Sequence, residues 1–182
     1  MKIIKTKIEG CYTIEPRVFE DERGSFFESF NLDLFSDKIG YKVNFVQDNQ
    51  SFSTFGVMRG LHFQKGIHSQ AKLVRVLSGK VLDIAVDIRK GSPTYGEHIA
   101  VILSSENKKQ FFMPKGFAHG FIVLSDTAEF FYKVDNFYAP QSESGVLYND
   151  PNLGIDWILD KSQIVVNNKD MELPLLNADT FL

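Results

Sequence analysis

The middle of the chain alternates between apolar and polar residues with the two-residue period of β-strands. The run 81–88 places aliphatic side chains on one face and two aspartates on the other: Leu82, Ile84, Val86 and Ile88 against Asp83 and Asp87. Turn residues flank this run at 79–80 and 90–93. Short strands at such close spacing indicate an antiparallel all-β sandwich or barrel. Further strands are predicted at 71–77, 97–103, 110–114, 118–124 and 127–134.

The one clear helical pattern before the C-terminal region covers residues 31–39. Asn31 can cap its first turn, and Gly40 can end it. Leu32, Leu34 and Phe35 supply apolar side chains, so we expect this helix to pack against the outside of the barrel.

No linker, internal repeat or low-complexity run interrupts the chain, and after residue 140 the alternation fades into a turn-rich tail. We therefore expect a single domain over residues 1–182. Its barrel core would cover about 51–140, between an N-terminal segment of about 1–50 and a C-terminal tail of about 141–182.

Composition narrows the class of protein. A chain of 182 residues with 43% hydrophobic content can bury one sizeable core. The net charge of -3 comes from interspersed charges without a basic run, so no nucleic-acid partner is expected. Cys11 is the only cysteine, which suits a reducing compartment. No apolar stretch resembles a signal peptide or a membrane span, so we predict a cytoplasmic protein with no membrane partner.

Two predicted strand segments, 56–64 and 113–121, each carry one histidine among apolar residues. In a barrel they could direct His62 and His119 into the same cavity. Arg59 and His62 have opposite strand parity, so both would reach that cavity only if Gly60 forms a bulge.

Strand parity adds two further candidates. Lys72 shares a face with Val74 and Val76, while Arg75 lies on the other apolar face, so at least one of these cations should be buried. Tyr132 shares a face with Phe130 and Ala128, which directs its ring toward the interior.

The candidate set combines a base that titrates near neutrality, a phenolic acid and cations that can hold negative charge: His62, His119, Tyr132, Lys72 and Arg59. These groups suit proton abstraction next to a carbonyl through an enolate. Each residue alone also has an ordinary explanation, as a satisfied histidine, a packed aromatic or a snorkelling lysine. The ordered combination favours catalysis. Sequence pattern cannot choose the carboxylate that would orient the base.

A metal site is not expected. Barrels with the Pro-x-Gly-x-x-His turn of residues 114–119 often resemble cupins, whose first motif supplies His-x-His and a nearby Glu as ligands. In this chain His62 is followed by Phe63 and Gln64, so that ligand set is broken and we predict a site without a metal.

An ordered series of motifs resembles the dTDP-4-dehydrorhamnose 3,5-epimerase family of nucleotide-sugar epimerases. The motifs cover almost the whole chain: 21–24 with 27–28, 47–51, 56–64, 70–76, 87–90, 114–121, and 124–129 running to 138–140. The resemblance implies a cupin-like antiparallel jelly-roll barrel with a few short flanking helices.

The resemblance also implies roles for individual residues. His62 would be the general base, oriented by Asp170, Tyr132 the acid on the opposite face, and Lys72 the cation that stabilises the enolate. Tyr138 would stack on the thymine ring. The rest of the substrate-binding shell would be Arg23, Glu28, Gln47, Asp48, Asn49, Arg59, His119, Glu143 and Lys169. The family resemblance further implies a homodimer, in which the N-terminal segment places Arg23 and Glu28 in the neighbouring subunit's site.

The expected function is therefore cofactor-independent epimerisation at C3 and C5 of dTDP-4-dehydro-6-deoxy-D-glucose, leading to dTDP-L-rhamnose and a surface polysaccharide such as O-antigen. Close alternatives are a C3-only epimerase and an enzyme for another nucleotide diphospho 4-keto sugar. Alternatives of another class are a metal-dependent cupin oxygenase and a non-catalytic sugar-binding barrel. The missing His-x-His argues against the oxygenase, and the set of His62, Lys72 and Tyr132 argues against the binding protein.

Overall fold

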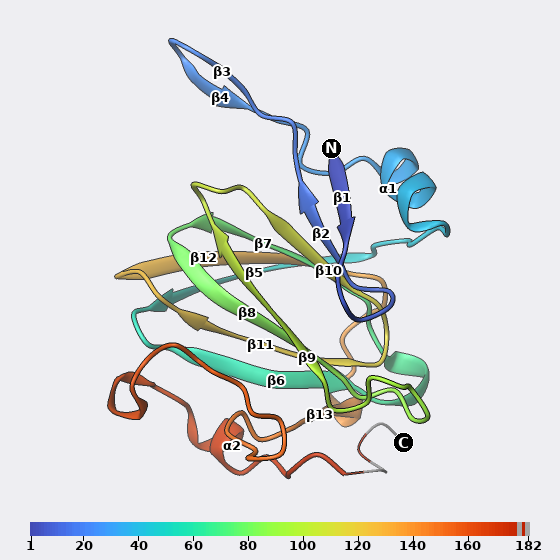
Figure 1. The fold of residues 1–182 in the computed structure, drawn as a ribbon, viewed down its shortest axis with the longest axis vertical. Coiled ribbons are helices and arrows are strands. Elements are labelled where there is room, and N and C mark those ends of the chain that lie inside the picture. The colour runs from blue at the N-terminus through green and yellow to red at the C-terminus, as the bar shows by residue number, and fades with distance from the viewer. Residues whose placement is uncertain (178–179, 181–182) are drawn as a thin grey trace.

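Two antiparallel β-sheets packed face to face form the body of the protein in the computed structural model, which describes residues 1–177 and Thr180 (Figure 1). The larger sheet has six strands in the order β1 (Lys2–Lys5), β2 (Tyr12–Glu15), β10 (Gln110–Met113), β7 (Lys72–Ser78), β12 (Thr127–Val134) and β5 (Gln47–Thr54). The smaller sheet has five, in the order β13 (Glu143–Gly145), β6 (Met58–Gln64), β11 (Phe117–Val123), β8 (Lys80–Asp87) and β9 (His98–Ser104).

Helical structure is sparse among the described residues. It consists of α1 (Leu32–Ile39), α2 (Asn168–Met171) and the 3-10 turns η1 (Gly66–His68), η2 (Pro140–Ser142) and η3 (Lys161–Gln163). The prediction of an antiparallel all-β core with a few short helices is confirmed. The strands predicted between residues 71 and 134 are present with their ends within about one residue, as expected for boundaries set by backbone hydrogen bonds.

The sheets extend beyond the predicted barrel limits of 51–140. The N-terminal strands β1 and β2 continue the larger sheet, because β2 pairs with β10. At the other side of this sheet, β5 begins at Gln47 and pairs with β12 along its whole length. The first fifty residues therefore contribute directly to the barrel of their own chain.

The alternation in β8 decides which side chains enter the space between the sheets. Its inward face carries Val81 and Ala85, which belong to the apolar cluster shared by both sheets, and it also carries Asp83 and Asp87. Its aliphatic face, with Leu82, packs instead under the C-terminal tail, whose buried members include Leu153 and Trp157. The aspartates therefore point into the barrel, and both are 0% exposed.

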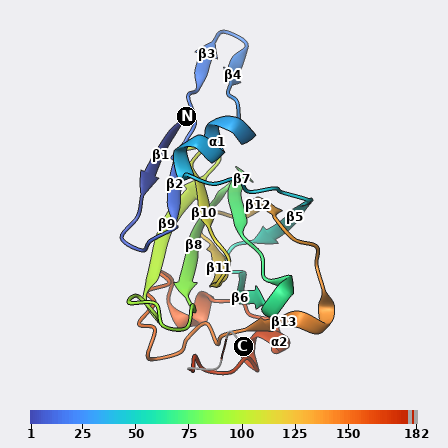
Figure 2. The same cartoon turned by 90° about the vertical axis from the view of Figure 1, so that its right-hand side faces the viewer.

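Helix α1 covers the outer face of the six-stranded sheet, as the sequence predicts. The Asn31 side chain accepts a hydrogen bond from the Leu34 amide, and Gly40 ends the helix with a φ of 86°. Phe35 packs edge-on against Phe112 with ring centroids 5.1 Å apart. Figure 2 shows this helix at the same end of the molecule as the β3–β4 hairpin.

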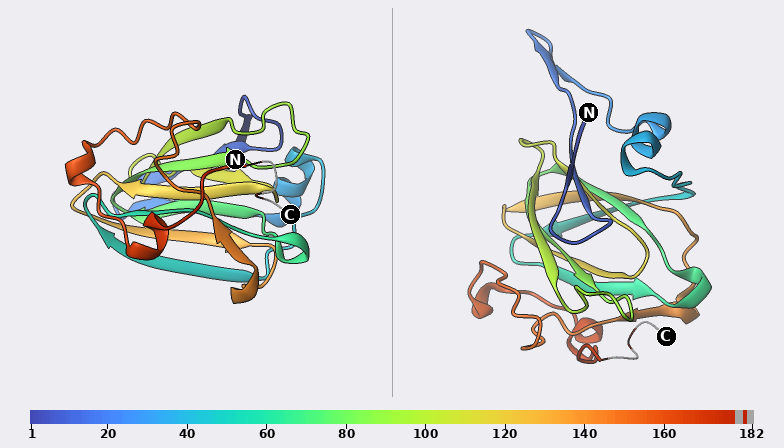
Figure 3. Two further views of the ribbon diagram at one scale, coloured as in Figure 1. Left: turned by 90° about the horizontal axis from the view of Figure 1, so that it is seen from below. Right: turned by 45° about the vertical axis from the view of Figure 1, so that its right-hand side comes forward.

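Two extensions leave the barrel in opposite directions. The hairpin of β3 (Phe19–Asp21) and β4 (Gly24–Phe26) projects away from both sheets, whereas the tail that carries α2 lies beneath the five-stranded sheet (Figures 1 and 3). Within the part of the chain that the structure describes, no helix is long and apolar enough to cross a membrane.

Candidate active site

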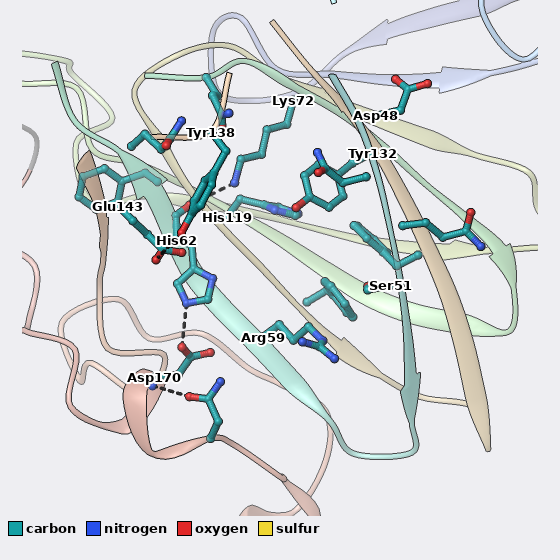
Figure 4. A pocket seen from close by; sticks show the side chains of 18 residues that line it. Asp48, Ser51, Arg59, His62, Lys72, His119, Tyr132, Tyr138, Glu143 and Asp170 are labelled. Atoms are coloured by element: carbon teal, nitrogen blue, oxygen red, sulfur yellow. Dashed lines mark hydrogen bonds and ion pairs between the residues drawn. The ribbon is translucent and has the colours of Figure 1, made fainter. Parts of the chain in front are cut away.

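A cavity of about 520 Å³ lies between the ends of the two sheets, where β5 and β12 face β6 and β13 (Figure 4). This volume is in the range of small-molecule binding sites. The lining side chains come from separate segments spread along the chain: Asp48, Asn49, Gln50, Ser51, Arg59, His62, Phe63, Gln64, Gln70, Lys72, His119, Phe121, Phe130, Tyr132, Tyr138, Glu143, Asn167 and Asp170.

A register shift between β6 and β11 brings Arg59 and His62 to the same cavity. His62 pairs with His119 and Arg59 pairs with Phe121, so β6 has one more residue than β11 between these pairs. The shift falls at Gly60, which has a φ of 130°, and an added Cβ there would lie 2.5 Å from the Cα of Gly120. Only glycine fits this approach, and the predicted bulge is confirmed.

Asp170 is the carboxylate that faces His62. Its Oδ1 lies 2.8 Å from Nε2 of His62, and its Oδ2 accepts a hydrogen bond from the Gly60 amide at 3.2 Å. Asn167 caps the short helix α2 by accepting from the Asp170 amide at 2.7 Å, which holds the carboxylate in place. Burial opposes ionisation of Asp170, but the hydrogen bond and charge of His62 outweigh it and lower the Asp170 pKa.

The strand pattern predicts that at least one of Lys72 and Arg75 is buried, and Lys72 is the one that lines the cavity. It is 8% exposed, and its Nζ donates to the His62 carbonyl at 3.3 Å. Burial lowers the Lys72 pKa to about 8, against the opposing charges of Asp83 and Glu143. Arg75 lies on the opposite face of β7, where its guanidinium is above the Phe131 ring at 5.4 Å. Of these two cations, Lys72 is therefore the one in the cavity.

Tyr132 and His62 stand on opposite walls, because β12 belongs to the six-stranded sheet and β6 to the five-stranded one (Figure 4). Tyr132 pairs with Asn49 and Phe130 with Ser51, so these four residues share one inward face. Burial raises the Tyr132 pKa, with the charge of Arg59 opposing. The phenol therefore keeps its proton at neutral pH.

The rim of the cavity is a hydrogen-bonded group around Tyr138. The Tyr138 hydroxyl donates to Glu143 Oε2 at 3.1 Å, and the same oxygen forms an ion pair with Lys169. The Tyr138 amide donates to Gln47, whose own side-chain amide donates to Asn49. Since the Tyr138 side chain is half exposed at the cavity mouth, its ring offers an open face to a planar ligand.

Known proteins match this chain over nearly its full length. The family model for dTDP-4-dehydrorhamnose 3,5-epimerase matches residues 5–178. The enzyme of that name from Salmonella typhimurium is 53% identical over 178 residues, which cover 97% of this chain and 96% of the relative. The chain belongs to the dTDP-4-dehydrorhamnose 3,5-epimerase family. It is therefore an isomerase of this type, and the motif resemblance seen in the sequence is confirmed.

Solved structures of family members agree with the fold of this epimerase. The structure from Elizabethkingia anophelis superposes with a TM-score of 0.95 at 51% identity and covers 100% of this chain and 99% of its own. A Legionella pneumophila enzyme solved with dTDP-4-keto-L-rhamnose gives a TM-score of 0.93 at 51% identity, covering 98% and 94%. The predicted cupin-like fold class is thereby confirmed. A 3'-monoepimerase from Streptomyces bikiniensis, solved with dTDP-quinovose, gives a TM-score of 0.88 at 33% identity. This match covers 94% of this chain and 86% of the monoepimerase chain.

Most residues predicted for the site of this epimerase lie together. The cavity is lined by His62, Tyr132, Asp170, Lys72, Arg59, His119, Asp48, Asn49, Tyr138 and Glu143. Gln47 and Lys169 are joined to this set through Asn49 and Glu143. The Asp48 carboxylate lies 2.9 Å from Lys133, so its charge is directed partly away from the cavity.

Arg23 and Glu28 are the two predicted site residues that neither line this cavity nor contact its lining. Arg23 lies at the turn of the projecting hairpin, where its guanidinium is 2.6 Å from Asp21. Glu28 accepts a hydrogen bond from the Asn31 side chain at 3.2 Å. Neither reaches the cavity of its own chain, so a role in binding requires a second chain.

Sequence reasoning did not assign Asp83 to the site, nor eight of the residues that line the cavity: Gln50, Ser51, Phe63, Gln64, Gln70, Phe121, Phe130 and Asn167. The Oδ2 atom of Asp83 lies 2.9 Å from Nε2 of His119, directly behind the cavity lining. The alternation of 81–88 separates Asp83 from the aliphatic face but carries no signal that the aspartate face is covered. Among the described residues, no group of three or more His, Cys, Asp or Glu side chains is placed to hold a metal ion. The metal-free and cofactor-free reaction stays a prediction.

Proposed function

We propose that this epimerase inverts both C3 and C5 of dTDP-4-dehydro-6-deoxy-D-glucose, with His62 as the base and Tyr132 as the acid. The observation that carries the assignment is the placement of these two side chains on opposite walls of one cavity. Inversion requires a proton to leave from one face of a carbon and another to arrive at the opposite face. Lys72 lies between the walls as the cation for the intermediate.

The first step is removal of the C5 proton by His62. Because Asp170 accepts a hydrogen bond from Nε2–H, the other ring nitrogen, Nδ1, is the basic one in this tautomer. The electron pair of the broken C–H bond moves into the C4 carbonyl and forms an enolate. The positive charge of the imidazolium is then stabilised by the adjacent carboxylate of Asp170.

The second step is protonation from the far side. Lys72 stabilises the negative charge on the C4 oxygen, which is the atom that changes charge most between ketone and enolate. Tyr132 gives its proton to the carbon on the face opposite His62. The same ketone acidifies the C3–H bond, so the same groups repeat the two steps there. The protonated base and deprotonated acid are reset by exchange with solvent.

Binding of the nucleotide is assigned to the rim. Tyr138 stacks on the thymine ring, and Arg59 and Lys169 hold the diphosphate or polar groups of the nucleotide. Gln47, Asp48, Asn49, His119 and Glu143 complete this shell. Support comes from the ligands of related structures, since the Legionella pneumophila enzyme holds a dTDP-linked sugar and a Bacillus anthracis enzyme holds TDP. A cytoplasmic location stays a prediction.

The test is incubation of the protein with dTDP-4-dehydro-6-deoxy-D-glucose and a chelator in heavy water, followed by NMR. Deuterium at both C3 and C5 is the expected result. A parallel incubation without protein measures spontaneous exchange beside the ketone. A third incubation contains the protein without chelator. Exchange no faster than the spontaneous rate in both protein samples would contradict an epimerase for this substrate, and exchange only without chelator would indicate a metal-dependent enzyme.

Inversion at C3 alone is the second candidate. The related 3'-monoepimerase from Streptomyces bikiniensis has the same fold, so the fold does not decide between the two outcomes. The deuterium assay separates them, because a C3-only enzyme leaves the C5 position protonated. Identity of about 50% to enzymes named 3,5-epimerases favours double inversion.

We also propose a homodimer in which Arg23 and Glu28 enter the partner's cavity. The projecting hairpin supports this arrangement, because it presents the exposed cross-strand pair Phe19 and Phe26, carries Arg23 at its turn and packs on neither sheet of its own chain. An exposed aromatic pair on a protruding hairpin is typical of an interface.

Mixing two inactive variants tests the dimer. Arg23→Ala chains keep their own His62, and His62→Asn chains can supply Arg23 to them across the interface. After unfolding and refolding a 1:1 mixture, we expect about a quarter of the unmodified activity, because half of the dimers are hybrids with one complete site each. Each variant refolded alone is the control. No recovery in the mixture would contradict the proposal that Arg23 is supplied across the interface.

A further inference from the structure

Asp83 is a buried carboxylate that does not line the cavity and yet contacts a residue that does. It points into the barrel from β8 and is 0% exposed. Its Oδ2 lies 2.9 Å from His119 Nε2, whereas its Oδ1 has no hydrogen-bond partner among the described residues. A buried carboxylate is costly unless a nearby positive charge or a hydrogen-bond donor compensates it.

Lys72 enters the same interior from the opposite sheet. Its Nζ makes one hydrogen bond within the described part of the chain, to the His62 carbonyl, although an ammonium group has three N–H donors. The ionisable groups that act on this part of the site are Asp83 on β8, Glu143 on β13, His119 on β11 and His62 on β6. Burial lowers the Lys72 pKa, and the charges of Asp83 and Glu143 oppose that change.

The two carboxylates are not equivalent. Glu143 Oε2 already accepts from Tyr138 and forms the ion pair with Lys169 at the rim. Asp83 has no competing cation of this kind among the described residues, because its one hydrogen-bond partner there is the His119 ring. Burial raises the Asp83 pKa, while His119 and Lys72 oppose that change, so carboxylate and ammonium favour each other's charged forms.

We propose that Asp83 is a positioning residue of the epimerase, which keeps Lys72 cationic and fixes the His119 ring without touching the substrate. This inference rests on the proposed role of Lys72 at the C4 oxygen. Burial alone works against that role, because a neutral amine cannot stabilise an enolate by charge. The Asp83 carboxylate, behind the cavity lining, compensates for the burial of Lys72. His119 donates Nε2–H to Asp83, which directs Nδ1 of the ring away from it.

The first test follows Lys72 itself by NMR in protein labelled with 13C at the lysine ε-carbons. The Lys72 signal is assigned by its loss in Lys72→Arg. In the unmodified protein we expect Lys72 to be charged at pH 7. In Asp83→Asn we expect its titration midpoint to fall by about one pH unit or more, because a neighbouring opposite charge has been removed.

Asp87→Asn is the matched control. Asp87 lies on the same inward face of β8 and is equally buried, but it is bound to Arg89, Ser92 and Thr94 and does not line the cavity. We expect the Lys72 midpoint to be unchanged in this variant. An unchanged midpoint in Asp83→Asn overturns the proposal. If that variant does not fold, a neutral Lys72 at pH 7 in the unmodified protein overturns it equally.

The pH profile of kcat gives the second readout. Loss of charge on Lys72 removes activity as pH rises, so a lower Lys72 pKa moves the alkaline limb of the profile to lower pH in Asp83→Asn. A purely structural role would lower kcat by the same factor at every pH. In a Lys72→Arg background, adding Asp83→Asn should no longer move that limb, because arginine stays charged.

These two measurements separate the inference from the proposed function. The lysine titration needs no substrate, so a shifted midpoint in Asp83→Asn supports the role of Asp83 even if the unmodified protein fails the deuterium assay. The opposite pair of results can also be recognised. If the unmodified protein passes the deuterium assay and Asp83→Asn leaves the Lys72 midpoint unchanged, the proposed function stands and Asp83 has no part in it.

Discussion

Replacement of His62 by Asn is expected to stop deuterium incorporation at both C3 and C5. General base catalysis contributes about 10²- to 10⁴-fold, so kcat should fall by that factor. One base serves both carbons in the proposed mechanism, and both exchange reactions should therefore be lost together. The measurement is the rate of deuterium entry at each carbon by NMR.

Among the described residues, no neighbouring group is placed to replace the His62 imidazole. Asp170 is 1% exposed behind the ring, and both of its oxygens already accept hydrogen bonds. The second cavity histidine, His119, is 7% exposed and bound to Asp83. Burial lowers the His119 pKa, with the charge of Asp83 opposing, which makes it a weaker base.

His68→Asn provides the matched control for His62→Asn. His68 lies in η1 on the loop after β6 and does not line the cavity, and its carbonyl rather than its ring accepts a hydrogen bond from Gln64. This variant should exchange both positions at the unmodified rate. If His62→Asn retains exchange near the original rate at either carbon, His62 is not the base for that carbon.

Replacement of Tyr132 by Phe should separate exchange from inversion. His62 can still remove a proton and return deuterium to the same face, so label enters the substrate. The inverted product requires a proton from the opposite wall, and its formation should fall by about 10²- to 10⁴-fold. NMR reports both quantities at once, since deuterium content and ring configuration are read from the same spectra.

The phenylalanine ring keeps the packing of Tyr132 against Phe130, whose ring centroid is 6.1 Å away. We therefore expect Tyr132→Phe to lose the catalytic acid while the fold is kept. Tyr148→Phe is the control, because Tyr148 packs near Trp157 within the C-terminal tail and does not line the cavity. Formation of inverted product by Tyr132→Phe at the original rate would assign the acid to another group.

Both experiments depend on the placement of His62 and Tyr132 on different sheets. The inward faces of the strands could be partly predicted from the sequence. Strand parity directed Tyr132 inward and placed Lys72 and Arg75 on opposite faces of one strand, and the structure confirms both results, with Lys72 as the cation that faces the cavity. It worked because the period of a β-strand is fixed, so one buried neighbour determines which face a side chain shares.

Asp170 could not be found from local pattern. It lies in a polar tail, where a charged residue is normally solvated, and only the family resemblance pointed to it. Its burial depends on the tail folding back beneath β6, so that Asp170 meets the Gly60 amide 110 positions earlier in the sequence. Contacts across such a separation leave no periodic signal in either segment.

The sequence by itself determined the all-β class, the faces of the central strands, helix α1 with both of its caps, and, through its motifs, the family. These features depend on local periodicity, capping residues and ordered motifs. The tertiary structure decided which carboxylate serves which histidine, with Asp170 at His62 and Asp83 at His119, and that the aspartate face of β8 points inward. It decided them because packing two sheets and a tail brings together side chains whose spacing in the sequence carries no information about their distance.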